Sequence, residues 1–583
     1  MNSLLSKLNN SLEEFRLRLS YRDALPQLVS LGVLSGIGAG LLIVAFRWLI
    51  EISSAYFLDE SGDNFESLSV PWRFLLPLTG AMLIGGALSF IDKKHYAVSV
   101  SHVLERLHNH QGVMPLRNVI VQFCGGVVAL VSGQSVGREG PGIHLGAGVG
   151  SLIGQWLHLP NNSLRTLVAC GSAAGISATF NTPMAGVIFA MEVILMEYTI
   201  VGFIPVIIAS VLAATISQLV FGADINFVVN GTDTNVLIQL PYLVFAGIVF
   251  SMAAALFIRL HLMFVKMQSY SIMLRMTFIG LVTGTIAVFV PEIMGAGYDS
   301  LNQALLGELG VALLISIVVA KLLVTATATG LGMVGGLIGP TLVVGGCLGA
   351  LLGILGNTLV PNASNPDFYI LLGMVAMMGA VLNAPLAALV AILELSSSAV
   401  IIFPSMFTVV VACLGVKQIF KYEGIFAEQL KLAGHDVYAS AGKNFLSRIG
   451  VQSVMNRAFV NCKNTISNDE AQQLIASENV WLIISNGNED NNKEECTQLV
   501  AMAKLARFME NPQLTEDKEL DLSQLSAKAL KTVEIEARAS LQEANTLVNS
   551  SGADAVLVIA SEPDSKITVG VVTKSTIASY HGM

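Results

Sequence analysis

A short charged run, Gly137-Arg138-Glu139-Gly140-Pro141, stands in a segment that is otherwise apolar enough to lie in a lipid bilayer. A charged side chain at membrane depth costs about 2.5–3.5 kcal/mol on insertion scales, so a charge retained there indicates a function. The glycines leave backbone amides uncovered, and Pro141 suits the first turn of a helix. A helix start with bare N–H groups and a positive dipole end binds anions. We therefore predict an anion site inside the membrane, for which the Glu139 carboxylate competes.

The same arrangement occurs a second time, in Gly336-Leu337-Ile338-Gly339-Pro340. The glycine-rich segments after the two prolines also match at a constant offset. A second pair of segments repeats as well, NTPMAGVIFAME (181–192) and NAPLAALVAILE (383–394). Paired hydrophobic segments interrupted by glycine and proline are typical of transporters that bind their substrate between two repeats.

Charged residues are scarce and unevenly distributed. Of the 583 residues, 53% are hydrophobic and 13% are charged, whereas soluble domains carry about 25% charged residues. Charges are sparse from Leu28 to Phe420 and common from Lys421 onward. We predict an N-terminal cytoplasmic segment (1–24), a transmembrane domain (25–420), a linker (421–450) and a soluble cytoplasmic domain (451–583).

Several apolar segments are only about 12–16 residues long, too short for a hydrocarbon core that needs about 20. Short segments with glycine or proline at their ends indicate helices that enter the membrane partway and stop. We therefore predict an all-α polytopic membrane fold with broken helices. Basic residues before the first apolar run, among them Arg16, Arg18 and Arg22, predict a cytoplasmic N-terminus.

Patterns typical of several other classes are missing from the sequence. The transmembrane region has no HExxH and no His/Asp cluster, which argues against an enzyme and against a metal site. The six cysteines have no CxxC spacing, and no basic patch with interleaved aromatic residues indicates nucleic-acid binding. Residues 1–24 do not resemble a cleavable signal peptide, which together with compact loops favours a bacterial inner (plasma) membrane.

Two segments of the C-terminal domain share one pattern. They begin near Val451 and Thr532, and each has the pattern of a strand, an amphipathic helix and an apolar strand that ends in a turn. A polar insert, about 488–530, separates them. We predict an α/β domain that contains two related modules.

Taken together, GREGP, GSAAGISATFNTPMAGVIFAMEV and GGLIGP resemble motifs of the CLC family of chloride channels and proton/chloride exchangers. The C-terminal domain resembles the pair of cystathionine-β-synthase-type (CBS) modules that some members carry in the cytoplasm. The resemblance implies a homodimer in the lipid bilayer, with one chloride pathway per subunit built from two inverted halves. Some members are voltage-gated, and no cofactor is implied apart from chloride as the transported ion.

Motif by motif, the resemblance assigns roles to individual residues. Glu139 falls on the gating glutamate, whose carboxylate occupies an anion site when the pathway is closed and leaves when it is protonated or displaced by chloride. Leu337 and Ile338 fall where backbone amides hold the central anion. The remaining residues of the first motif expected at the anion site are Gly137, Arg138 and Gly140.

Two anion-pathway positions depart from the family pattern. The family's GSGIP motif, with its anion-coordinating serine, is not intact near residues 97–101. An ungapped alignment puts Val98 on the serine, and Ser99 is the nearest candidate. The pore tyrosine aligns with Ala399, so we expect the inner constriction to lack its aromatic gate.

The internal proton-handling glutamate of the exchangers aligns with Val193, which cannot carry a proton. This pattern favours a passive, pH- and chloride-sensitive chloride channel, with a proton/chloride exchanger as the alternative. For an exchanger, Glu192 and Glu197 are the candidates for the proton pathway. Glu192 and Glu394 occupy equivalent repeat positions, so a structural or dimer-facing role explains them as readily.

Three further residues leave alternatives open. Arg138 either packs against backbone carbonyls or pairs with Glu139. His144 is either a hydrogen-bonded core histidine or a pH sensor. Thr576 stands where CBS pairs usually place an aspartate for the ribose of an adenine nucleotide, so the domain is interpreted as a dimerisation or gating-coupling module in preference to a nucleotide site.

Overall fold

The computed structural model describes residues 24–58, 64–222, 227, 236–359, 366–435, 444–447, 449–485, 497–510, 519–522, 525, 529–562 and 565–580, with 13, 15, 16 and 19. Most of the predicted N-terminal segment 1–24 and about half of the polar insert 488–530 lie outside these residues. The chain divides into two compact units. One comprises residues 28–157 and 164–441, and the other comprises residues 1–27, 158–163 and 442–583. The division at residues 441–442 falls inside the predicted linker 421–450.

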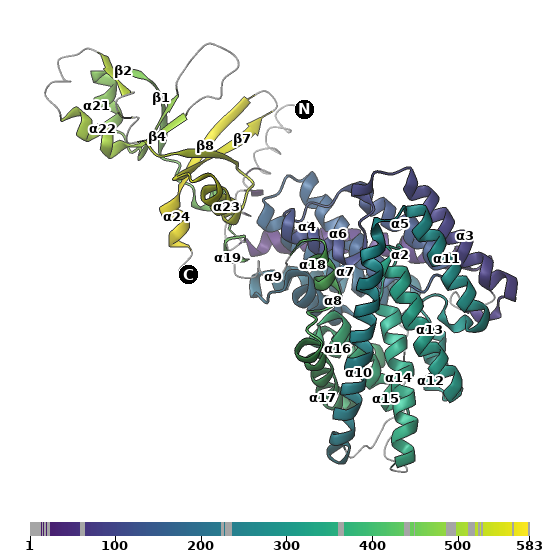
Figure 1. Ribbon diagram of the computed structural model, residues 1–583. Coiled ribbons are helices and arrows are strands. Elements are labelled where there is room, and N and C mark those ends of the chain that lie inside the picture. Colours follow the sequence, from purple (N-terminus) through teal and green to yellow (C-terminus); the bar gives the residue numbers. More distant parts are fainter. Residues whose placement is uncertain are drawn as a thin grey trace. The chain divides into compact units, whose positions relative to one another are not determined.

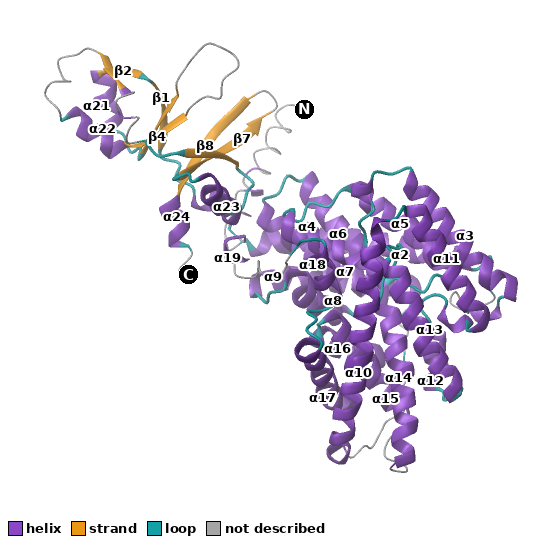
Figure 2. Cartoon of the chain, in the orientation of Figure 1, coloured by secondary structure: helices purple, strands orange, loops and turns teal. Residues whose placement is uncertain are grey.

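The first unit is built of helices throughout its described residues, and its two halves follow one another along the chain (Figures 1 and 2). The helices of the first half are α2 (Leu25–Ser54), η1 (Phe65–Ser67), α3 (Val70–Ser89), η2 (Lys93–His95), α4 (Ser99–Asn109), α5 (Leu116–Val131), α6 (Glu139–Trp156), α7 (Asn161–Phe180), α8 (Pro183–Phe189), the π-helical η3 (Ala190–Leu195) and α9 (Ile200–Phe221).

The second half repeats this order. Its helices are α10 (Val236–Val265), η4 (Lys266–Ser269), α11 (Ile272–Phe289), η5 (Pro291–Ile293), α12 (Tyr298–Leu305), α13 (Val311–Gly330), α14 (Ile338–Leu359), α15 (Pro366–Leu382), α16 (Pro385–Ser396), η6 (Ala399–Ile401), α17 (Ile402–Leu414), the π-helical η7 (Gly415–Ile419) and α18 (Ile425–Leu432). The short helices α4, α8, α12 and α16 recur at matching places, as broken helices in two repeats require.

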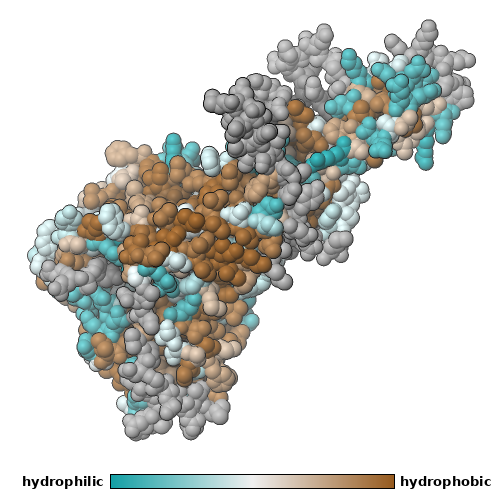
Figure 3. Space-filling view, turned by 180° about the vertical axis from the view of Figure 1, so that it is seen from behind, coloured by the Kyte–Doolittle hydropathy of each residue, from teal (hydrophilic) through white to brown (hydrophobic). Residues whose placement is uncertain are grey.

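The surface of this unit is apolar over a wide band (Figure 3). In the described part of the chain, 8 helices are long and apolar enough to cross a membrane. Large side chains on them, such as Leu41 and Trp48 of α2 and Leu256 of α10, are about half exposed. Exposed apolar surface on this scale would be costly in water and is favourable in contact with lipid.

Glycines allow the central helices to pack backbone against backbone. On α6 and α7, a Cβ added to Gly146 would overlap the carbonyl oxygen of Gly171. On α14 and α15, a Cβ added to Gly345 would overlap the carbonyl oxygen of Gly373. Small residues at such crossings allow the close approach on which helix association in lipid depends. The glycine-rich pattern that marked the repeat is therefore also the pattern that packs it.

Each half supplies a helix cap to the other. The Glu394 carboxylate of α16 accepts hydrogen bonds from the first amides of α8, Met184 N (2.9 Å) and Ala185 N (2.7 Å). Glu192 of η3 accepts from the first amides of α16, those of Leu386 (3.2 Å) and Ala387 (2.7 Å). A helix start leaves its first N–H groups without intrahelical partners, and here the other repeat provides them.

The second unit contains two small α/β modules with the same strand arrangement. In the first, β1 (Phe459–Lys463) is parallel to β3 (Trp481–Ser485), which is antiparallel to β4 (Thr497–Ala501). In the second, β6 (Thr532–Glu536) is parallel to β7 (Ala555–Glu562), which is antiparallel to β8 (Ser565–Thr573). The remaining elements are α19 (Asn444–Ser447), α20 (Val451–Val454), β2 (Thr465–Ser467), α21 (Asn468–Ala476), α22 (Met502–Met509), β5 (Glu519–Asp521), α23 (Leu541–Ser551) and α24 (Lys574–Ser579).

Candidate functional site

The two repeated glycine motifs meet in space. Gly137 N–H donates to the Gly336 carbonyl (2.7 Å), and Gly336 N–H donates to the Gly137 carbonyl (2.8 Å), which forms an antiparallel bridge between the loops. Helices α6 and α14 begin directly after these loops. Their positive dipole ends and their first N–H groups therefore converge, and this arrangement stabilises a negative charge.

The Glu139 carboxylate lies at this junction and is fully buried. The Tyr298 hydroxyl donates to its Oε1 at 2.5 Å, and the Gly339 N–H donates to its Oε2 at 3.1 Å. A Cβ on Gly137 would overlap Oε2, and a Cβ on Gly339 would lie 3.0 Å from Oε1. We call the space between Tyr298 and Gly339 the carboxylate site, and the two glycines keep it open.

Ser99, the predicted hydroxyl ligand, lies beside the same junction. A Cβ on Gly140, at the start of α6, would lie 3.2 Å from Ser99 Oγ. Ser99 is the first residue of α4 and has φ +69°, a left-handed conformation that favours glycine. Its N–H donates to Gln122 Oε1 at 2.7 Å. A non-glycine residue in this conformation at a functional site is a form of backbone strain.

A large cavity leads to Ser99 from one side. Its volume is about 810 Å³, and Ser99 and Leu337 are part of its lining. His102, His261 and Arg275 line it as well. Glu139 and Tyr298 are not among the lining residues, so the cavity ends before the carboxylate site.

The other predicted site residues lie around the junction in different ways. Arg138 is the N-cap of α6; its guanidinium lies 6.0 Å from the Tyr298 ring centroid, and its Nε has no hydrogen-bond partner among the described residues. Leu337 and Ile338 are buried where α14 begins. In the structure, the amide that reaches the carboxylate belongs to the next residue, Gly339.

The proton-pathway candidates lie in other surroundings. Val193 is buried, and Glu197 follows η3 with its own N–H donated to the Met191 carbonyl. Ala399, which the family resemblance aligns with the pore tyrosine, is exposed at the start of η6. Glu192 is held by the α16 amides described above. Its carboxylate is therefore bonded to the start of α16, and the carboxylate site belongs to Glu139.

His144 is buried, and its Nε2 lies 2.8 Å from His102 Nδ1. Arg106 Nε donates to the other ring nitrogen of His102 at 3.1 Å. This chain of contacts is what a hydrogen-bonded core histidine requires. His144 Nδ1 has no partner in the part of the chain that the structure describes.

Sequence reasoning missed two residues of the site, Tyr298 and Gly339. Both were detectable from the repeat, because Gly339 and Tyr298 stand at the same offset from Gly140 and Ser99 as Gly336 does from Gly137. The offset that relates the two glycine motifs also relates the first residues of α4 and α12.

A family model described as voltage gated chloride channel matches residues 80–417, more than half of the chain. The chain belongs to the CLC family. This CLC protein is therefore a multi-pass integral membrane protein, and the predicted helical fold with an additional C-terminal α/β region is confirmed.

Individual relatives carry names of both transport types. A ClcB-like protein of Ralstonia nicotianae, provisionally named a chloride channel, is 30% identical over 391 residues, which cover 65% of this chain and 91% of the relative. The H(+)/Cl(-) exchange transporter ClcA of Vibrio cholerae is 28% identical over 401 residues, 65% of this chain and 84% of the relative. The names therefore support anion transport without deciding between channel and exchanger.

Solved structures share the fold at low sequence identity. A slow cyanobacterial Cl−/H+ antiporter aligns with a TM-score of 0.62 and 20% identity, and covers 70% of this chain and 97% of its own. A eukaryotic CLC transporter aligns with a TM-score of 0.60 and 16% identity over 94% of this chain and 97% of its own. The second alignment extends into the C-terminal α/β unit.

Proposed function

We propose that this CLC protein conducts chloride passively across the membrane and that Glu139 is its gate. The observation that carries the proposal is the fully buried carboxylate held by a hydroxyl and a backbone amide between two helix starts. A carboxylate oxygen and a chloride ion accept the same donors. When protonation or competing chloride displaces Glu139, those donors become available to the permeating anion.

Two observations support passive conduction. The family resemblance aligns Val193 with the internal proton-handling glutamate, and this buried aliphatic side chain cannot carry a proton. Glu192, the adjacent acid, has both oxygens committed to the α16 amides. These two bonds hold the carboxylate at the start of α16, which supports a structural role for Glu192 in preference to proton transfer.

Proton/chloride exchange remains the second candidate because relatives at 26–28% identity, from Vibrio vulnificus and Vibrio cholerae, are named exchange transporters. In that case the inner proton would travel by a route other than position 193. The two candidates differ in one measurable quantity, the uphill movement of protons that a chloride gradient drives.

The proposal extends to the assembly and to the C-terminal unit. We propose a homodimer with one pathway in each subunit, in a bacterial inner membrane with both termini in the cytoplasm. The duplicated strand order of β1-β3-β4 and β6-β7-β8 supports a CBS pair. The Thr576 hydroxyl lies 2.9 Å from Thr573 Oγ at the start of α24, and a threonine lacks the carboxylate that would hold a ribose, so we propose that the pair acts without adenine nucleotide.

The test is chloride efflux from liposomes that contain the purified full-length protein, with proton movement recorded at the same time. We expect chloride efflux without uphill proton movement, and we expect Glu139→Gln to raise efflux at neutral pH and to remove its dependence on pH. Uphill proton transport in the wild-type protein would refute the channel and favour the exchanger. Efflux in Glu139→Gln identical to the wild type at every pH would refute the gate.

A further inference from the structure

Two hydroxyl residues occupy equivalent places in the two halves. Ser99 is the first residue of α4, and Tyr298 is the first residue of α12. Ser99 Oγ lies beside Gly140, where a Cβ would be 3.2 Å away, and Tyr298 Oη lies beside Gly339, where a Cβ would be 2.8 Å away. Each hydroxyl therefore faces the helix start of its own half, α6 for Ser99 and α14 for Tyr298.

Tyr298 lies on the far side of Glu139 from the large cavity. The cavity reaches Ser99 and does not include Tyr298, whereas Tyr298 is partly exposed and donates to the fully buried carboxylate. Tyr298 therefore contacts the carboxylate site from a place outside the cavity that reaches Ser99.

The phenol ring is held in place by aromatic contacts. The Phe180 ring packs edge-on against the Tyr298 ring with centroids 6.3 Å apart, and the Phe227 ring lies 6.4 Å away. A fixed ring leaves only the hydroxyl proton free to turn about the C–O bond. The hydroxyl can thus donate to whichever acceptor occupies the carboxylate site, without a change of rotamer.

We infer that Tyr298 is a ligand of the permeating anion at the carboxylate site, the counterpart in the second half of Ser99 in the first. The inference rests on the proposed function and identifies a residue that touches the transported ion. In the closed state Tyr298 donates to Glu139 Oε1. When the carboxylate leaves, the same O–H and the Gly339 N–H donate to the anion that replaces it.

Binding of chloride to gate-free protein tests the inference. Glu139→Ala removes the carboxylate, and isothermal titration of this full-length variant with chloride then reports the emptied site. We expect Glu139→Ala/Tyr298→Phe to bind chloride about tenfold more weakly, the effect of one lost hydrogen bond to an ion. The matched control is Glu139→Ala/Tyr242→Phe, because Tyr242 donates its hydroxyl to the Leu352 carbonyl on α14 and makes no contact with Glu139.

The outcomes distinguish two roles for Tyr298: a ligand of the anion, or a residue that only holds the Glu139 carboxylate in the closed state. Tyr298→Phe in the wild-type background removes a donor to the carboxylate, so both roles predict higher chloride efflux at neutral pH. Only the ligand role predicts weaker binding in the Glu139→Ala background. Equal affinities for Glu139→Ala with and without Tyr298→Phe would overturn the inference, provided that both variants elute as folded protein of the wild-type size.

The same measurements distinguish a failure of this inference from a failure of the proposed function. If Glu139→Ala neither binds chloride nor passes it, the chloride pathway itself is refuted. If Glu139→Ala binds and passes chloride and Tyr298→Phe changes neither, the pathway stands and only the role of Tyr298 is refuted.

Discussion

Glu139 can act as a gate because its closed position is held by few interactions. Burying an ionised carboxylate costs several kcal/mol unless charge-assisted hydrogen bonds compensate for lost water. Here two donors from other segments, Tyr298 O–H and Gly339 N–H, provide that compensation. Protonation removes the need for it, and chloride satisfies the same donors, so either event releases the side chain at modest cost.

Gly137 provides a direct test of this closed position. A Cβ there would overlap Glu139 Oε2, and φ at residue 137 is not in the left-handed region, so alanine fits the backbone but displaces the carboxylate. We expect Gly137→Ala to raise chloride efflux at neutral pH severalfold and to flatten its pH dependence, as Glu139→Gln does. Gly86→Ala on α3, where a Cβ would meet no atom within 4 Å, is the control. Wild-type efflux in Gly137→Ala would contradict the position assigned to the carboxylate.

The limits of the sequence are clearest at this scale. The matching glycine motifs were sufficient to predict that Glu139 lies at the interface between the two repeats, because constant spacing implies equivalent structure. Tyr298 was not predicted: the repeat offset relates it to Ser99, but its contact with Glu139 joins α12 to α6 and depends on how these helices pack. The amide of Gly339 was missed for a related reason: the direction in which the Glu139 side chain folds back depends on the packing of both loops.

At the scale of elements, Glu192 and Glu394 are each part of one repeat and cap a helix of the other, which explains two acids inside the helical unit. The sequence left Glu192 open to a structural or a proton-transfer role, and only the three-dimensional pairing of η3 with α16 and of α16 with α8 gives the acids their hydrogen-bond partners. Pro183 and Pro385 begin the capped helices, and proline lacks the N–H that would otherwise need a partner. The two halves thus depend on each other for the integrity of these helix starts.

We expect the loss of the Glu192 carboxylate and the loss of the Glu394 carboxylate to lower the stability of the protein by similar amounts. Glu192→Ala and Glu394→Ala each leave two amides of a helix start without their acceptors, at a cost of about 1–2 kcal/mol. Thermal unfolding in detergent measures the loss as a lower apparent Tm, and Glu→Gln at the same positions, which keeps one acceptor oxygen, should lose less. Chloride efflux per folded protein should stay at the wild-type value. A selective loss of proton movement in Glu192→Ala would instead assign Glu192 to proton transfer.

The loop before α3 offers a prediction about pH. Burial, together with nearby Glu292 and Asp299, raises the pKa of Glu66 on η1 above its usual value of 4.5. The folded state therefore binds this proton more tightly than the unfolded chain, so its contribution to stability is full below pH 4.5 and is lost as the pH rises through the folded pKa. We expect Glu66→Gln to raise the apparent Tm at pH 7 and to leave it unchanged at about pH 4. A lower Tm at pH 7 would show that the ionised carboxylate is stabilising.

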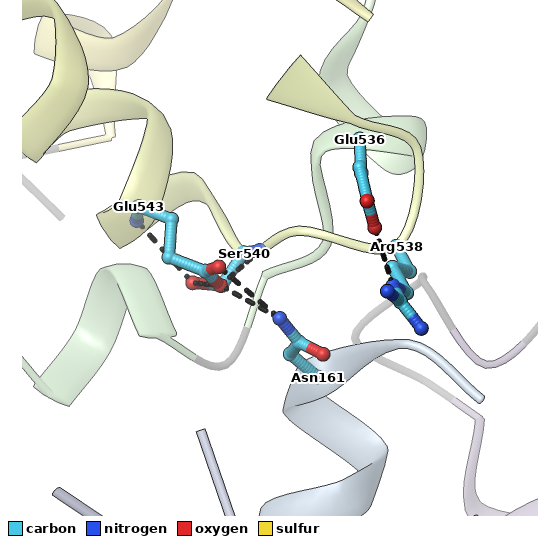
Figure 4. Close-up of polar contacts among 5 residues, drawn as sticks. All are labelled: Asn161, Glu536, Arg538, Ser540 and Glu543. Atoms are coloured by element: carbon cyan, nitrogen blue, oxygen red, sulfur yellow. Dashed lines mark hydrogen bonds and ion pairs between the residues drawn. The ribbon is translucent and has the colours of Figure 1, made fainter. Parts of the chain in front are cut away.

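At the scale of the whole molecule, the second compact unit joins stretches that are far apart in the chain. It includes residues 158–163, which end the α6–α7 connection and begin α7, together with the C-terminal modules. Figure 4 shows how they meet: Asn161 Nδ2 donates to both Glu543 oxygens, at 3.0 and 3.2 Å. Asn161 N–H also donates to the Arg538 carbonyl at 3.0 Å.

Glu543 also has a role within its own helix, where the capping box holds its carboxylate in place. It is the third residue of α23 and forms a capping box with Ser540, whose N–H and Oγ both lie 2.8 Å from Glu543 Oε1. The equivalent helix of the first module, α21, has the same box built from Ser467 and Glu470. Glu543 thus accepts hydrogen bonds both from its own helix start and from Asn161. Glu470 caps α21 in the same way, in the other module, and is therefore a matched control.

A reciprocal exchange tests this contact. Asn161→Asp sets two carboxylates against each other, and we expect the amides at the start of α23 to exchange hydrogen about tenfold faster in the full-length protein, equivalent to about 1.4 kcal/mol. Adding Glu543→Gln supplies an amide donor to the new carboxylate at position 161, while the amide oxygen at position 543 still accepts from Ser540, so protection should return. Adding Glu470→Gln to Asn161→Asp should leave exchange fast, because Glu470 caps the other module. If the backbone amides of Leu541–Ser551 exchange hydrogen at the wild-type rate in Asn161→Asp, the contact with Asn161 does not stabilise α23.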